Sequence, residues 1–175
     1  MVQIQIFVLS NLELLFKNRI LFTMELDTTD KKLIQLLQED CKKTTKHYAD
    51  QLNLSKTAVY ERIRRLERQG IITKYVALVN KEKVQRDFTV LCHVRLVQHT
   101  KENVKQFERE ILKLEEVSEC FHVSGDYDYI LKVNVENMKR YRDFMVTKLT
   151  VIPNIGNTQS SFVIQEVKSS TAVFV

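Results

Sequence analysis

The stretch TTKHYADQLNLSKTAVYERIRRLERQGII, residues 44–72, decides how the N-terminal half of this chain folds. Thr44 or Thr45 can cap a short helix, because a threonine oxygen accepts a hydrogen bond from the first free backbone N–H groups. Asn53 then tolerates the left-handed backbone conformation that a tight turn requires. The first part of the stretch therefore predicts a short helix followed by a tight turn.

A second helix follows this turn. Ser55 can cap it, it runs to about Gln69, and Gly70 stops it. Apolar side chains recur on one face at helical spacing, namely Val59, Ile63 and Leu66. Polar or charged side chains fall on the other face, namely Thr57, Glu61, Arg64, Arg65 and Arg68. A helix that is buried along one side and cationic along the other has the shape that enters a DNA major groove.

The distribution of charge supports this interpretation. The whole chain carries 27 Lys+Arg against 22 Asp+Glu. Residues 42–86 alone contain 12 basic and 4 acidic side chains, whereas residues 1–41 and 87–175 are each slightly acidic. A local basic patch on an otherwise balanced protein is an electrostatic footprint for phosphates.

A third helix precedes this pair. Asp27 can cap it, and Asp30 in its first turn complements the helix dipole. Its buried stripe consists of Leu26, Leu33, Ile34 and Leu37. The segment ITKYVALVN, residues 72–80, then alternates enough to be a strand that leads to a second domain.

Around Phe88 the hydrophobic period changes from helical to two, which marks the second domain. Strands are expected at 88–97, about 117–124, about 127–135, and through Phe162, Ile164 and Glu166. One helix is expected at Val104, Phe107, Ile111 and Leu114, and another at Met138, Tyr141, Met145 and Leu149. This β-α-β-β-α-β order predicts a ferredoxin-like sandwich.

The sheet of that sandwich is expected to carry apolar residues on both faces. Leu91, Val97 and Ile130 fall on the face that the two helices do not cover. Apolar side chains on an uncovered face indicate a partner subunit, so a dimer formed sheet to sheet is expected.

Composition argues against several other classes of protein. Three widely spaced cysteines and four histidines form neither a metal-ligand pattern nor a disulfide framework, which favours reduced thiols in the cytoplasm. Three glycines cannot build a phosphate-cradling loop, and the sequence offers no nucleophile with a base beside it. We therefore expect neither an enzyme nor a metal or cofactor site.

The first 23 residues are apolar but are interrupted by Glu13, Lys17 and Arg19. No uninterrupted apolar run in this segment is long enough to span a membrane, and the segment lacks the features of a secretory signal. We interpret residues 1–23 as an N-terminal extension upstream of a true start at Met24. The alternative is an appended strand or helix that packs on the body or on a partner.

Three segments resemble the Lrp/AsnC (feast/famine) family of transcriptional regulators: LDTTDKKLIQLLQED at 26–40, LNLSKTAVYERIRRLERQGIITKYVALVN at 52–80, and SGDYDYILKV at 124–133. The resemblance extends from Leu26 to about Lys168. It implies an α+β protein with an N-terminal helix-turn-helix (winged-helix-like) domain and a C-terminal ferredoxin-like βαββαβ effector and oligomerisation domain. The expected divisions are the helix-turn-helix domain at 24–75, a linker strand at 76–86, the ferredoxin-like domain at 87–170 and a tail at 171–175.

On this resemblance, the residues that contact double-stranded DNA are expected at the start and on the exposed side of the second helix, with two more on the helix before it. They are Thr45, Lys46, Ser55, Lys56, Thr57, Tyr60, Arg64, Arg65 and Arg68. The alternative for the arginines is pairing with Glu61 and Glu67 on the helix surface.

The resemblance also implies an amino-acid effector bound between dimers near the turn at 125–128. A zwitterion needs an acceptor for its ammonium group and N–H donors for its carboxylate, which such a turn can supply. The expected effector residues are Val123, Gly125, Asp126, Tyr127, Asp128, Met138, Ser160, Ser161 and Phe162. The alternative is that Gly125 and Asp126 only form a hairpin turn.

The expected function is a sequence-specific, nucleoid-associated DNA-binding regulator that forms a homodimer and, as the family implies, higher rings such as an octamer. An architectural, chromatin-like DNA-binding protein with weak sequence preference and no effector stays open as an alternative. The sequence leaves the operator and the identity of the amino acid undecided.

Overall fold

The computed structural model describes residues 25–175, which form two compact units. The first contains the chain up to Val76 together with Ser170–Val175, and the second contains Ala77–Ser169. The interpretation of residues 1–23 and of Met24 lies outside the described residues. Within them, no helix combines the length and apolar character needed to cross a membrane.

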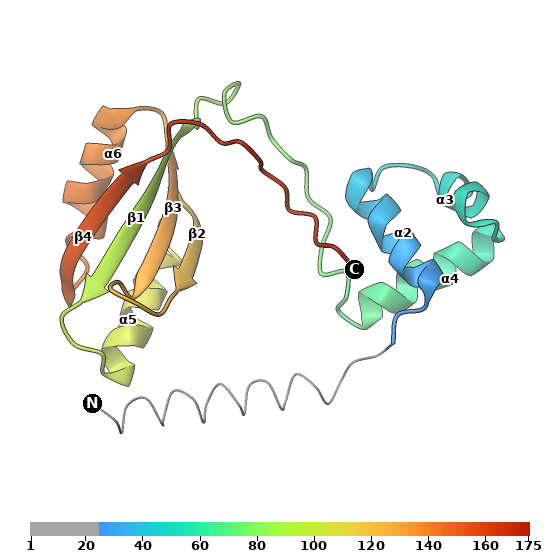
Figure 1. Ribbon diagram of the computed structural model, residues 1–175, viewed down its shortest axis with the longest axis horizontal. Helices are drawn as coiled ribbons and strands as arrows, with labels where there is room; N and C mark the ends of the chain where they lie inside the picture. The colour runs from blue at the N-terminus through green and yellow to red at the C-terminus, as the bar shows by residue number, and fades with distance from the viewer. Residues whose placement is uncertain (1–24) are drawn as a thin grey trace. The chain divides into compact units, whose positions relative to one another are not determined.

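Three helices build the first unit (Figure 1): α2 (Thr28–Glu39), α3 (Thr45–Leu52) and α4 (Lys56–Arg68). The side chains of Asp27, Thr44 and Ser55 each accept a hydrogen bond from a backbone N–H in the first turn of their helix. Asn53 has φ of 54°, so the left-handed turn between α3 and α4 is confirmed. The predicted helix-turn-helix is therefore present, with Thr44 rather than Thr45 as its first cap.

The core of this unit draws on all three helices. Its fully buried side chains are Leu33, Ile34, Tyr48, Ala49, Val59 and Leu66. Leu26, Leu37, Leu52 and Ile63 pack against them and are partly buried. The apolar stripes predicted for the three helices thus meet in one cluster, which fixes α4 with its other side toward solvent.

The second unit is an antiparallel sheet with strand order β2-β3-β1-β4 (Figure 1). Its strands are β1 (Phe88–Leu96), β2 (Val117–His122), β3 (Tyr129–Val135) and β4 (Ile155–Phe162). Its helices are α5 (Lys101–Ile111) and α6 (Met138–Phe144), and α6 continues into a π-helical turn, η1 (Met145–Leu149). The order confirms the predicted ferredoxin-like sandwich.

One face of the sheet forms the core with the helices. The buried residues alternate along β1 and β3, and they are Val90, Cys92, Val94, Leu96, Tyr129, Leu131, Val133 and Val135. Phe107 and Ile111 of α5, and Tyr141, Phe144 and Leu149 of α6 and η1, complete the cluster. Met138 differs from expectation, because it lies at the start of α6 and is 51% exposed.

Two expected strand segments are wrong. Residues 72–80 form no strand and pair with no strand that the structure describes, and residues 81–85 form a turn. The last strand ends at Phe162, where it pairs with Val90, and does not reach Ile164 or Glu166.

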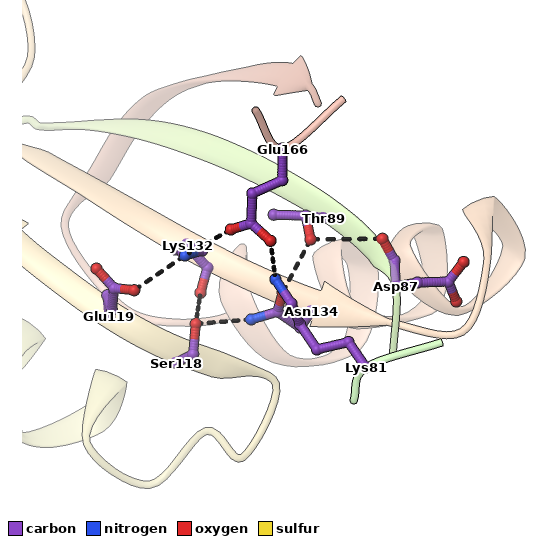
Figure 2. Close-up of polar contacts among 8 residues, drawn as sticks. All are labelled: Lys81, Asp87, Thr89, Ser118, Glu119, Lys132, Asn134 and Glu166. Carbon is purple, nitrogen blue, oxygen red and sulfur yellow. Dashed lines mark hydrogen bonds and ion pairs between the residues drawn. The ribbon is translucent and has the colours of Figure 1, made fainter. Parts of the chain in front are cut away.

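The face of the sheet that the helices leave open begins with a row of polar contacts (Figure 2). The Thr89 hydroxyl donates to Asn134, whose amide in turn donates to Ser118. Above this row, Glu166 pairs with Lys81 at 2.6 Å and with Lys132 at 3.3 Å. The segments before β1 and after β4 are therefore fastened over this end of the open face, and the apolar residues lie farther along it.

Candidate functional site

Two arginines of α4 point into the first unit rather than toward a ligand. Asp30, whose side chain is 3% exposed, accepts from Arg62 through Oδ1 at 2.6 Å and pairs with Arg65 through Oδ2. Arg62 also pairs with Asp27 at 2.7 Å. The Asp30 N–H and then Arg62 hold the pKa of Asp27 below its usual range. Arg65 therefore ties α4 to α2, and its role as a phosphate or base contact stays a prediction.

Tyr60 and Arg64 lie on the outward side of α4. Arg64 Nε donates to the Tyr60 hydroxyl at 3.2 Å, and the guanidinium lies 5.6 Å from the centre of the Tyr60 ring. Hydrogen bonding to Tyr60 and then to Glu67 raises the pKa of Arg64. Tyr60 is 48% exposed, so this stacked pair presents an aromatic edge and a cation to solvent. The predicted pairing with Glu67 occurs at 3.4 Å, a long contact that DNA phosphates can compete with.

The remaining predicted DNA contacts gather around the starts of α3 and α4. Ser55 uses its hydroxyl to accept from Ala58 N, so it acts first as a helix cap. Lys46, Lys56 and Thr57 are exposed, and Thr45 is half-buried. Arg68, also exposed, makes no ion pair with any residue that the structure describes.

Sequence reasoning missed Arg62 and the role of Asp30 as a buried ion-pair partner. The signal was present as matched spacing: Asp27 and Asp30 are three residues apart on α2, and Arg62 and Arg65 are three apart on α4. Residues three apart lie on the same helix face, so two such pairs can meet across a helix contact.

The turn between β2 and β3 is the second candidate site. Val123 N donates to Asp128 O at 2.8 Å, which closes a loop over residues 124–127. Gly125 has φ of +130°, a conformation that other residues rarely adopt. None of the backbone N–H groups of residues 124–127 donates to an acceptor in the described part of the chain. The loop therefore presents unpaired N–H donors at the surface.

Side chains of β1 and β4 hold this loop in place. Arg95 Nε donates to Asp126 O at 2.6 Å, and its guanidinium lies 5.4 Å from the centre of the Tyr127 ring. The Tyr127 hydroxyl donates to Gln159 at 2.6 Å. The Asp126 carboxylate remains exposed and has no hydrogen-bond partner among residues 25–175.

Asp128 is occupied within the chain. Its Oδ2 accepts from Leu96 N at 2.7 Å, and its Oδ1 lies 2.8 Å from His99 Nε2. A ligand ammonium group would have to displace His99 to reach this carboxylate. The geometry thus makes Asp128 a support for the loop, and Asp126 the better-placed acceptor.

The other predicted effector residues lie toward the opposite end of the sheet. Ser160 bonds to the Tyr141 hydroxyl at 2.6 Å, and Phe162 packs edge-on against the Tyr141 ring. Ser161 points to the opposite face of the sheet from both. Phe162 pairs with Val90 and the loop joins β1 at Val94, four residues or roughly 13 Å along the strand. One chain therefore does not bring the predicted effector residues together.

A hollow of about 340 Å³ on the second unit is lined largely by charged side chains. Arg86 pairs with Glu136 at 2.8 Å, and Lys148 pairs with Glu116 at 2.6 Å. Burial, the largest single cause, raises the pKa of Glu116, but hydrogen bonds from Lys148 and the backbone, with the charges of Lys148 and Arg86, together hold this pKa below its usual value. Because these charges are matched internally, the hollow offers a zwitterion less than the loop does.

The described residues contain no cluster of three or more His, Cys, Asp or Glu side chains that could hold a metal ion. Burial raises the pKa of the thiols of Cys92 and Cys120, which disfavours their reactive thiolate forms.

Comparison with known proteins assigns each of the two units to a known type of domain. The profile described as winged helix-turn-helix DNA-binding matches residues 26–73, and the Lrp/AsnC ligand binding domain matches residues 89–173. The leucine-responsive regulatory proteins of Escherichia coli K12 and Klebsiella pneumoniae are each 35% identical over 151 residues, covering 86% of this chain and 92% of the relative.

Solved structures give the same result. A transcriptional regulator from Neisseria meningitidis, crystallised as its L-Met complex, is similar with a TM-score of 0.81 and 30% identity. An AsnC family regulator from Agrobacterium tumefaciens has a TM-score of 0.82 and 31% identity. Each alignment covers 85% of this chain and 96% of the other.

Proposed function

The chain belongs to the Lrp/AsnC family of DNA-binding transcriptional regulators, and we propose that it reads a two-fold symmetric operator through α4 under the control of an amino acid. The observation that carries the proposal is the division of α4 into two sides. Arg62 and Arg65 are held inward by Asp30, while Tyr60, Arg64 and Arg68 face outward. We assign the chain no catalytic step, and we place its action at the nucleoid in the cytoplasm.

The start of α4 is the part that we expect to read bases. Lys56 and Thr57 lie in its first turn, where a recognition helix of this kind contacts base edges. Tyr60 is one turn farther along and carries an exposed aromatic ring. Arg64 and Arg68 continue the same side and are suited to phosphates or to guanine. Sequence discrimination is therefore expected from the first turn, and general affinity from the later arginines.

Dimerisation would supply the second half-site. On the open face of the sheet, beyond the polar row, lie the apolar side chains of Leu91, Ile130 and Phe121, and Phe121 is 51% exposed. A second copy that covers this patch removes its apolar surface from water. A two-fold dimer presents two α4 helices, which favours pseudo-palindromic sites with half-sites roughly 34–36 Å apart or a multiple of that distance.

For the effector we propose an α-amino acid, bound at the loop of residues 124–127. The free N–H groups of this loop suit a carboxylate, and the exposed Asp126 carboxylate suits an ammonium group. The relative from Neisseria meningitidis was solved with L-Met, which supports this ligand class. Because Met138 at the start of α6 and Phe162 at the end of β4 lie away from the loop, we propose that another subunit supplies that part of the site.

A ligand bound between subunits can shift assembly only if it binds one assembly state more tightly than another. We therefore propose that the amino acid changes the balance between dimers and larger rings such as octamers, and so changes operator occupancy.

The test combines sedimentation and DNA binding, with each of the common amino acids added in turn. We expect at least one of them to change both the mass of the assembly and its affinity for operator DNA. Alanine substitution of Asp126 should abolish this response, while substitution of Glu110, a carboxylate on α5 that pairs with Lys113, should leave it intact. Constant mass and constant affinity across all the amino acids would contradict effector control.

A further inference from the structure

Residues 170–175 fold with the helix-turn-helix rather than with the sheet that precedes them in the sequence. The Gln38 side chain, on α2, makes two hydrogen bonds to the backbone of one residue in this segment. Gln38 Nε2 donates to Val173 O at 3.0 Å, and Val173 N donates to Gln38 Oε1 at 2.7 Å. The amide therefore acts as a neighbouring strand would, because paired residues in an antiparallel sheet exchange the same two bonds.

Packing fixes the segment at a second point. Val175 is partly buried against the core cluster of the three helices. Phe174, between these two anchored residues, is 96% exposed although its ring is the larger apolar group. Burial of the smaller side chain indicates a defined register, in which the Val173 backbone is bonded to α2, the Val175 side chain packs on the helices and Phe174 faces away.

The start of the same stretch is fastened in the other unit. Glu166 pairs with Lys81 and Lys132 over the open face of the sheet, as Figure 2 shows. These two lysines hold the pKa of Glu166 below its usual range, with Lys81 the larger cause. Three residues lie between Glu166 and Ser170, where the chain rejoins the first unit.

We propose that residues 166–175 form a second tether between the DNA-binding unit and the sheet, in addition to the linker after Val76. The tether is anchored at Glu166 on one side and at Val173 and Val175 on the other. Two connections leave the helix-turn-helix fewer orientations than one connection does. When both helices of a dimer must engage DNA at once, this restriction raises the effective concentration of the second helix at its half-site.

Docking of the segment is tested first, on the full chain, by amide exchange at Val173 measured by NMR. Gln38→Ala removes both hydrogen bonds and is expected to speed exchange about tenfold. Gln35→Ala, at an exposed position of the same helix, should leave exchange unchanged. Val175→Ala should also speed exchange, whereas Phe174→Ala should not. An effect of Phe174→Ala equal to that of Val175→Ala would overturn the register, and no effect of Gln38→Ala would overturn docking.

The amide-exchange measurement also identifies which copy supplies the segment. Protection of Val173 that is unchanged on dilution through the range where assemblies dissociate supports docking within one chain. Protection that disappears on dilution assigns the segment to a second copy and overturns the proposal as stated.

The role of the tether is tested with DNA carrying either two half-sites or one, a readout that rests on the dimeric operator proposed above. A chain ended after Ser169 is expected to bind the full site several-fold more weakly and the half-site equally well. Gln38→Ala in the full chain should weaken binding to the full site in the same way, and in the shortened chain it should cause no further loss of binding. Equal losses of affinity for both DNAs would mean that the segment only stabilises α2. No loss of affinity for either DNA would mean that the segment does not restrict orientation. Either result would overturn the proposed tether. Failure of the wild-type chain to bind DNA would instead contradict the proposed function and leave the exchange result standing.

Discussion

The outward side of α4 and the loop between β2 and β3 differ in how much of a site one chain contains. Along α4, Tyr60, Arg64 and Arg68 follow one another at helical spacing, and a single helix presents them together. The loop presents free N–H groups and Asp126, but Phe162 pairs with Val90, roughly 13 Å along β1 from the point where the loop joins that strand. A site on one helix is complete in the monomer, whereas a site spread over a sheet requires residues from a second subunit.

The largest effect is expected where the first unit depends on a single buried carboxylate. Asp30→Asn removes the charge that pairs with Arg62 and Arg65 and leaves both cations facing an amide. We expect the free energy of unfolding of the helical unit to fall by roughly 3 kcal/mol, as it does when one partner of a buried ion pair is removed. Urea unfolding followed by circular dichroism measures this loss.

Asp50→Asn on α3 is the matched control for this change, because Asp50 is exposed. Its unfolding midpoint should stay at the wild-type value. Equal midpoints for Asp30→Asn and the control would show that the inward arginines do not depend on Asp30.

The second prediction separates the two sides of α4 by function. Replacing both Arg64 and Arg68 by alanine should weaken DNA binding roughly 100-fold, about tenfold for each arginine removed, and leave stability nearly unchanged. Arg62→Ala should do the reverse, since its guanidinium pairs with Asp27 and Asp30. Fluorescence anisotropy with labelled operator DNA, paired with urea unfolding, measures both quantities. The assignment of sides fails if Arg62→Ala weakens DNA binding by the folded protein as much as the double variant does.

The third prediction concerns the loop. Gly125→Ala places a side chain at φ of +130°, where nothing crowds the new methyl group but the backbone itself is strained. We expect a cost of about 1 kcal/mol in stability and a weaker response to the amino acid, with DNA affinity in its absence unchanged. Ser124→Ala changes a neighbouring exposed position without this strain and serves as the control. Titration calorimetry with the responsive amino acid measures the loss, and equal binding by the two variants would remove the loop from the ligand site.

The smallest effect is a pH dependence at the start of α2. The pKa of Asp27 is lowered from 3.8 by the Asp30 N–H and then by Arg62. A lowered pKa in the folded state means that the contribution to stability is complete above pH 3.8 and is lost as the pH falls through the lower folded value. Asp27→Asn keeps a capping oxygen but cannot titrate.

The difference in urea midpoint between wild type and Asp27→Asn should therefore be present at neutral pH and should shrink as the pH falls below 3.8 through the lower folded-state pKa. A difference that stays constant over this range would mean that the Asp27 charge is not coupled to folding.

The features that were predicted correctly from the sequence depend on residues close together in the chain. Ser55 and Asn53 determine a cap and a turn through their own side chains, and both are confirmed. The alternation of β1 likewise predicted its buried face. The wrong predictions all depend on contacts between distant residues. Residues 72–80 have strand character but pair with no strand in the described part of the chain. The contact between Arg65 and Asp30 was not predicted either, because nothing in α4 itself shows that Asp30 lies beside it.

The ligand site shows the same limit. A Gly-Asp turn could be recognised from the sequence, but the contact of Asp128 with Leu96 N and His99 depends on how β1 and the loop meet. Both aspartates of the turn were expected to contact the ligand, and only the structure distinguishes the occupied Asp128 from the exposed Asp126.

The central claim is that the outward side of α4 reads a specific DNA sequence. Selection of bound sites from random double-stranded DNA, with the wild-type chain and with Thr57→Ala, tests it most directly. We expect a two-fold symmetric motif for the wild type and relaxed preference at one position of each half-site for the variant. Enrichment of nothing beyond A/T-rich or easily bent DNA, identical for the two proteins, would contradict the claim and favour an architectural DNA-binding protein.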